Sequence, residues 1–168
     1  MPLMNLCDLQ TFMASNNNVR FLNIQELTGP TRIITQALVA IHDSGYVHND
    51  IQPANILINT QMESILQLSL GGFSRCVKAE ENRTRPVPMM SDTNEYSYLY
   101  RAPEVILSRG MVCSGASDVW SLGVTLYVLA TGRFPFCSEF EIVSQPVTWN
   151  DAEMLKGRSN MQFKSLIT

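Results

Sequence analysis

The residues best suited to chemistry lie in one short polar stretch between Tyr46 and Asn59, which reads YVHNDIQPANILIN. An acid, Asp50, and an amide, Asn55, stand five residues apart in this stretch. The apolar residues on either side predict a short strand at Tyr46–Val47 and a second at Ile56–Ile58. A loop held at both ends by buried strands gives a site a rigid support. The alternative to a functional site is a simple hairpin, in which these polar residues serve only to turn the chain.

The stretch resembles the catalytic loop of protein kinases, His-Arg-Asp-Leu-Lys-x-x-Asn. His48, Asp50 and Asn55 match this pattern, whereas Asn49 replaces the arginine and Gln52 replaces the lysine. The resemblance implies that Asp50 holds the position of the catalytic base and that Asn55 is a weak metal ligand. It also implies that Gln52 brings no charge to a moving phosphoryl group, and that Asn49 does not pair with a phosphorylated segment.

A second kinase motif is expected one strand further along, where the chain reads Gly71-Gly72-Phe73-Ser74. Kinases have Asp-Phe-Gly at this place, and its aspartate binds magnesium. Phe73 matches the motif, but Gly72 has no side chain to replace the carboxylate. The resemblance therefore implies that the main magnesium ligand is absent, and it assigns Phe73 and His48 to the core as packing residues. An ordinary glycine-rich strand end is the alternative interpretation.

Two more motifs complete the resemblance. Ala102-Pro103-Glu104 matches the Ala-Pro-Glu signature, and the run DVWSLGV at 118–124 resembles the central helix of the kinase C-terminal lobe. In that family the aspartate of this helix, here Asp118, holds the backbone of the catalytic loop. Ser97 matches the place of a hydroxyl that faces the catalytic aspartate. The arginine that pairs with Glu104 in kinases lies in helices beyond this chain, so we expect a partly buried charge without a partner unless another arginine reaches it.

Hydrophobic periodicity predicts the elements that hold these motifs in place. An amphipathic helix begins at Gly29-Pro30 and ends at Gly45. A helix that is apolar on nearly all sides starts near Asp118 and ends at Gly132, which places it in the core. The remaining predictions are a short helix near Asp8–Met13, an alternating strand at Leu66–Leu70, an irregular segment over 75–101, and short helices at Trp149–Lys156 and from Lys164.

The fold class that follows is α+β, mainly helical with a small β-hairpin region. Four motifs in the order and spacing of a kinase imply the C-terminal lobe of that fold, without the N-terminal lobe and the last helices of the C-terminal lobe. A chain of 168 residues is normally one domain. We therefore expect one partial kinase-like domain over residues 1–168, from the hinge to the start of the penultimate helices of the lobe.

Composition narrows the classes of partner and the compartment. A net charge of −3, without a lysine- or arginine-rich run, argues against nucleic acid and anionic membranes as partners. The first basic residue is Arg20, so no signal peptide is expected, and the longest uncharged run is shorter than the ~20 residues of a membrane span. Four scattered cysteines without a Cys-x-x-Cys pair indicate free thiols rather than a zinc site or disulfides. We expect an intracellular protein, cytoplasmic or nuclear.

The sequence favours a catalytically inactive, pseudokinase-like domain that binds protein partners through the surface of its C-terminal lobe. No cofactor is expected for that function. One alternative is an ATP- and magnesium-dependent serine/threonine kinase whose N-terminal lobe is missing from this chain or supplied by another. The stretch from Asp50 to Asn55 is closer to the serine/threonine type than to the tyrosine type. A degenerate gene fragment without a stable function is the third possibility.

Overall fold

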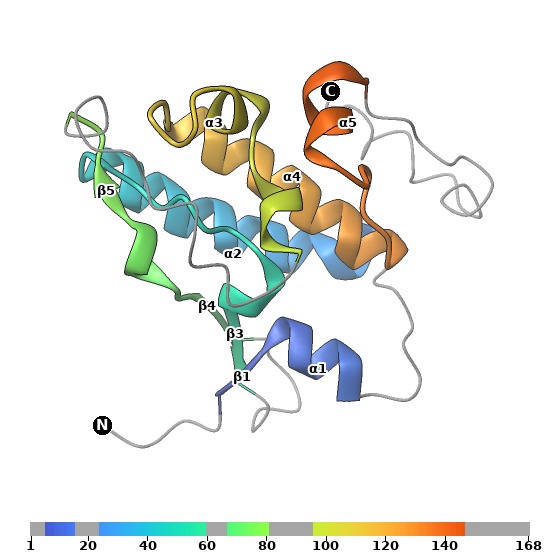
Figure 1. Cartoon of the computed structure of the whole chain (residues 1–168). Helices are drawn as coiled ribbons and strands as arrows, with labels where there is room; N and C mark the ends of the chain where they lie inside the picture. The colour runs from blue at the N-terminus through green and yellow to red at the C-terminus, as the bar shows by residue number, and fades with distance from the viewer. Residues whose placement is uncertain (1–5, 16–23, 60–66, 81–95, 147–168) are drawn as a thin grey trace.

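The part of the chain that the computed structural model describes is mainly helical, with two small antiparallel sheets. The predicted fold class is confirmed. None of the helices in this part has both the length and the apolar character that crossing a membrane requires. The described residues, coloured in Figure 1, are 6–15, 24–59, 67–80 and 96–146.

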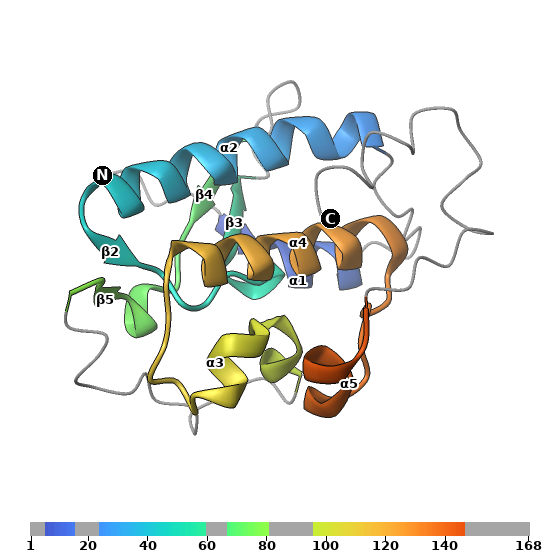
Figure 2. The same ribbon diagram turned by 90° about the horizontal axis from the view of Figure 1, so that it is seen from above.

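One helix lies in the middle of the molecule. Helix α4 (Gly115–Thr131) lies between the long helix α2 (Ile24–Asp43) on one side and two short helices on the other, α3 (Pro103–Leu107) and α5 (Glu139–Ser144) (Figures 1 and 2). Helix α1 (Leu9–Ser15) lies on one side of this helical layer, below it in Figure 1, and the strands lie below the layer or along its left edge. The two long helices therefore form the support on which the loops are held.

Helix α2 is fixed by a buried apolar stripe. Leu27, Ile34 and Leu38 are all almost fully buried, and their spacing of seven and four residues places them on one face of the helix. The prediction that the helix begins at Gly29-Pro30 is wrong, because it starts at Ile24 and Pro30 lies inside it. Burial of Leu27 on the same stripe favours the earlier start over the proline boundary. The end is as predicted, with Gly45 in the left-handed conformation at φ +78°.

Helix α4 is buried on most of its sides, as its sequence predicts. The side chains of Leu129, Thr125 and Asp118 are 0% exposed. The Ser117 hydroxyl accepts a hydrogen bond of 3.2 Å from the Ser114 N–H at the start of the helix. The helix ends at Gly132, whose φ of +69° suits a residue without a Cβ. It packs against α2 and is the central element of the described core.

The strands pair in a way that excludes the hairpin alternative. Strand β3 (Ile56–Asn59) lies between β1 (Leu6–Asp8) and β4 (Gln67–Leu70) in one antiparallel sheet. Strand β2 (Tyr46–Val47) pairs instead with β5 (Val77–Lys78) in a second sheet. The two strands on either side of the candidate loop therefore belong to different sheets, and the loop bridges them.

Several local predictions were incomplete. Segment 75–101 was predicted to be irregular, yet it contains β5 and a 3₁₀ turn at Ser97–Tyr100. Helices α3 and α5 were not predicted at all, because each is too short to show a hydrophobic period. The predicted helices after residue 146 and Leu66 of the predicted strand lie outside the described residues.

Leu129→Ala should lower the free energy of unfolding by about 2–5 kcal/mol, because it leaves a cavity at a fully buried position of α4. Urea unfolding followed by circular dichroism measures this change. Leu107→Ala is the matched control, since that leucine is 69% exposed and should change stability by less than about 0.5 kcal/mol. Equal effects of the two substitutions would contradict the position of the core.

Candidate functional site

A buried carboxylate holds the candidate loop against helix α4. Asp118 Oδ2 accepts a 2.8 Å hydrogen bond from the His48 N–H, and Oδ1 accepts a 2.8 Å bond from the Asn49 N–H. His42 Nε2, at the end of α2, lies 2.8 Å from Oδ2. Three N–H donors therefore surround a side chain that is 0% exposed, and this compensates the loss of its hydration. The loop is thereby fixed to both long helices.

His48 links the loop to the strand end that precedes Gly72. Its Nδ1 accepts a hydrogen bond from the Asp50 N–H (3.3 Å), so its Nε2 carries the proton and donates to the Gly71 carbonyl (2.9 Å). The ring is buried among these partners. Burial lowers the pKa of His48 below its ordinary value of 6.5, although the nearby Asp118 carboxylate opposes the shift. The neutral imidazole is therefore the form that the fold favours.

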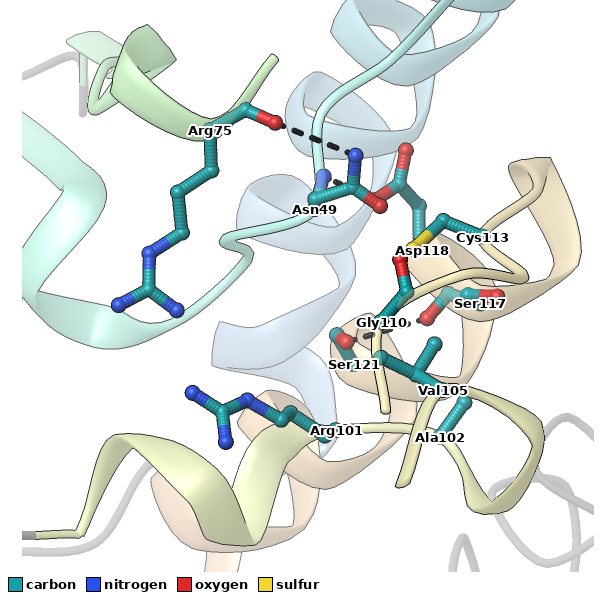
Figure 3. A pocket seen from close by; sticks show the side chains of 10 residues that line it. All are labelled: Asn49, Arg75, Arg101, Ala102, Val105, Gly110, Cys113, Ser117, Asp118 and Ser121. Carbon is teal, nitrogen blue, oxygen red and sulfur yellow. Dashed lines mark hydrogen bonds between the residues drawn. The ribbon is translucent and has the colours of Figure 1, made fainter. Parts of the chain in front are cut away.

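Asn49 replaces the motif arginine with a neutral residue that suits the backbone. Its φ is +63°, a region in which asparagine is several-fold enriched among residues other than glycine. Its Nδ2 donates to the Arg75 carbonyl at 3.2 Å (Figure 3). A small cavity of about 20 Å³, with room for about one water molecule, lies beside it and is also lined by Arg75 and Arg101. Asn49 thus keeps a backbone contact but supplies no positive charge.

Gln52 stands between the acid and segment 96–101. Its Nε2 donates to Asp50 Oδ1 at 2.7 Å, and its Oε1 accepts a 3.2 Å hydrogen bond from the Ser97 hydroxyl. The other oxygen of Asp50 lies 4.0 Å from Arg75 Nε. Ser97 was expected to face Asp50, and in the structure its hydroxyl contacts Gln52 instead. Both carboxylate oxygens of Asp50 therefore face donors from within the protein.

Asn55 and Gly72 are brought together, and the amide fills the space beside the glycine. Asn55 Nδ2 donates to the Asp50 carbonyl at 2.7 Å. Gly72 has a φ of +75°, and a Cβ placed on it would overlap the Asn55 side chain. Any side chain at this position would therefore need Asn55 to move. Nothing in the local sequence could have indicated this contact, because it joins residues on two different turns.

Two predictions about individual residues are wrong. Phe73 is not a core residue, because its side chain is 52% exposed. Its ring is tilted by 57° against the His48 ring, with 4.9 Å between the centroids. Glu104 was expected to lack a partner, but its Oε1 accepts a 2.7 Å hydrogen bond from the Ser117 hydroxyl. Ser117, the third residue of α4, therefore satisfies one oxygen of Glu104 where the kinase family uses an arginine.

The site also contains residues that no motif predicts. His42, Arg75 and Ser117 match no motif, yet each contacts a motif residue. His42 had a detectable signal, since it stands at the predicted end of a helix just before the glycine turn that leads back to the loop. Among the described residues, no group of three or more His, Cys, Asp or Glu side chains is arranged to hold a metal ion.

Comparisons with known proteins agree with the motifs. The family model of the protein kinase domain matches residues 1–165. Serine/threonine-protein kinase 16 of Mus musculus is 33% identical over 110 residues, which are 64% of this chain and 36% of the relative. Mitogen-activated protein kinase kinase kinase 6 of Homo sapiens is 38% identical over 106 residues, which are 63% of this chain and 8% of the relative.

The fold is also similar to a solved kinase structure. The crystal structure of the Rad53 kinase domain and SCD2 matches with a TM-score of 0.65 at 23% sequence identity. The match covers 96% of this chain and 54% of the solved chain. The chain therefore spans about half the length of that structure and 36% of the length of serine/threonine-protein kinase 16.

Stability should fall as the pH is lowered from about 7 to about 5, because His48 is neutral in the fold. Its pKa is lower in the folded than in the unfolded protein, so the unfolded chain binds more protons in this range. The stabilisation is complete above the unfolded pKa of about 6.5 and is lost as the pH falls below it. Urea unfolding of wild type and His48→Gln at several pH values tests this. The variant should have a flatter pH profile, and parallel profiles would contradict the assignment.

Proposed function

The chain belongs to the protein kinase family, and from this premise we propose that it is a non-catalytic, kinase-like domain that acts by binding other proteins. The observation that carries the first half of the proposal is the pair Gly72 and Asn55. The position that holds the magnesium carboxylate in kinases is a glycine here, and the Asn55 side chain fills the adjacent space. The substitution has therefore been accommodated by the packing around it.

The residues present do not fit a magnesium ion. Magnesium requires near-octahedral oxygen ligands and is usually bound through one or two carboxylates. Asn55 offers one neutral oxygen, while its Nδ2 is held by the Asp50 carbonyl. Gly72 offers no side-chain oxygen at all. Binding of magnesium with ATP would therefore lack the protein carboxylate on which it depends.

The charge that assists phosphoryl transfer is also reduced. Gln52 is neutral where kinases have a lysine, and its amide is bonded to Asp50 and Ser97. Loss of one preorganised electrostatic contact typically lowers a rate by about 10²–10³-fold. Two independent losses would lower a kinase turnover of ~1–100 s⁻¹ by about 10⁴–10⁶-fold. These magnitudes favour a non-catalytic role.

One observation favours a second candidate function, a serine/threonine kinase that uses a nucleotide-binding lobe outside this sequence. Asp50 keeps the base position, and the loop that carries it is held by the Asp118 hydrogen bonds. Two of the similar proteins are named serine/threonine-protein kinase 16 and mitogen-activated protein kinase kinase kinase 6. The difference between the two functions lies in magnesium and ATP binding, which can be measured directly.

The protein should show no magnesium-dependent thermal shift with ATP, and Gly72→Asp should not create one. The new carboxylate would meet the Asn55 side chain in a left-handed backbone position, so we expect a destabilisation of about 1–3 kcal/mol. Gly29→Asp is the matched control, because a Cβ placed on Gly29 would have no heavy atom within 4 Å. A magnesium-dependent shift in the wild type that disappears in Asn55→Ala would establish the kinase alternative instead.

The second half of the proposal concerns an apolar groove between α2 and α4, with a volume of about 680 Å³. Leu27 and Leu38 of α2 and Trp120 of α4 line it. Val39 and Val119, which also line it, are 52% and 59% exposed. A groove between two packed helices can accept the apolar face of a third helix. We therefore assign it to an amphipathic helix of a partner protein.

Charge narrows the chemistry of that partner. Arg32 and His42 line the groove, and among the described residues no aspartate or glutamate does. A partner helix with acidic residues beside its apolar stripe would be electrostatically complementary to this lining. A helix with lysines in the same positions would face Arg32 unfavourably. The proposed partner segment is therefore an acidic amphipathic helix.

An acidic amphipathic peptide, with leucines at i, i+3, i+4 and i+7 and flanking glutamates, should bind the full chain more tightly than its lysine analogue. Val119→Glu should weaken binding at least about tenfold, because it places a charge in the apolar lining. Leu107→Glu is the control, since Leu107 is 69% exposed and does not line the groove. Fluorescence anisotropy measures the affinities.

Three outcomes would overturn this assignment. The first is equal binding by wild type and Val119→Glu. The second is concentration-dependent self-association that Val119→Glu abolishes, which would make a second copy the occupant. The third is peptide binding only after removal of residues 147–168, which would make that segment the occupant.

A further inference from the structure

Three side chains form one continuous hydrogen-bonded series, two from the candidate loop and one from a segment 45 residues further along the chain. Asp50 Oδ1 accepts from Gln52 Nε2, and Gln52 Oε1 accepts from the Ser97 hydroxyl. Gln52 and Ser97 are each only 6% exposed. The series joins the candidate loop, which follows β2, to the 3₁₀ turn Ser97–Tyr100. Water has little access to replace these bonds.

The chemistry of this series requires an amide at its centre. Gln52 donates through its nitrogen and accepts through its oxygen, so it satisfies a carboxylate and a hydroxyl donor at the same time. A lysine at this position could only donate. An ionised glutamate could only accept, and it would place a second negative charge beside Asp50. Neither lysine nor glutamate can therefore both donate to Asp50 and accept from the Ser97 hydroxyl.

The 3₁₀ turn that Ser97 begins is fixed at its other end to α4. The Tyr100 carbonyl accepts a 2.8 Å hydrogen bond from the Ser121 hydroxyl. Leu99 is 3% and Tyr100 is 7% exposed, so burial also holds this end. At the beginning of the turn burial is weaker, since Tyr96 is 50% exposed. There the turn is held by the hydrogen bond between Ser97 and Gln52. Loss of this hydrogen bond should therefore allow the turn to open at its Ser97 end.

We propose that Gln52 is a positioning residue that holds the turn Ser97–Tyr100 against the candidate loop. The glutamine thus has a structural role at a position where kinases use a cation. The proposal goes beyond the proposed function, because it holds whether or not the chain transfers phosphate.

Hydrogen exchange of the full chain tests the role of Gln52 without any nucleotide. The Leu99 N–H donates to the Tyr96 carbonyl and the Arg101 N–H to the Tyr98 carbonyl, so these amides report on the turn. Gln52→Ala should reduce their protection roughly tenfold, because one buried and one partly buried hydrogen bond are lost. Amides in the middle of α2 and α4 should be unaffected. The control is Gln36→Ala, a glutamine exposed on α2.

Two further variants separate a specific contact from general loss of packing. Ser97→Ala should have little additional effect in the Gln52→Ala background, since both substitutions remove the same contact. Gln52→Glu should reduce protection at neutral pH, where the introduced carboxylate lies beside Asp50. Protection should recover towards the wild-type value at acidic pH, because a protonated carboxyl can both donate and accept.

Each outcome decides the proposal. Unchanged protection in Gln52→Ala, or additive effects of Gln52→Ala and Ser97→Ala, would overturn it. So would a Gln52→Glu protein whose protection, relative to wild type at the same pH, does not improve on acidification. A magnesium-dependent ATP shift would contradict the proposed non-catalytic function and would leave this test of Gln52 unaffected.

Discussion

The structure around the candidate site depends on one buried carboxylate. Asp118 is 0% exposed and accepts hydrogen bonds from the backbone of His48 and Asn49, while His42 lies 2.8 Å away. Removal of a partner from such a group costs several kcal/mol, because a buried charge is left without compensation. The backbone path of the loop is therefore determined by α4. Side chains on the loop can change without changing that path, provided that the two N–H groups remain.

The substitutions in the loop follow from this arrangement. Asn49, Gln52 and Gly72 each stand where the kinase pattern has a charged residue, and the two amides are satisfied by neighbours inside the protein. Gly72 is accommodated differently, because the Asn55 side chain fills the space beside it. The side chains that replace the arginine and the lysine are therefore held by hydrogen bonds within the protein.

The sequence predicted the features that depend on local pattern. The two long helices, the glycine ends at Gly45 and Gly132 and the strands on either side of the loop follow from periodicity and backbone preference. The contact of Asn55 with Gly72, the exposure of Phe73 and the Ser117 partner of Glu104 were not predictable. Each depends on where two distant segments meet, which no local pattern encodes. The motifs located the site, and long-range packing determined which side chains contact one another there.

Helix α4 connects the two halves of the proposed function. Asp118 holds the loop, and the next residue along the helix, Val119, lines the apolar groove. His42 takes part in both, because it contacts Asp118 and also lines the groove. A helix bound in the groove would therefore contact a residue that is one hydrogen bond away from the loop. Coupling between two sites requires a partner with different affinities for two arrangements of such a shared element. His42 is the residue at which the two surfaces meet, so a partner that moves its imidazole would change the contacts of Asp118.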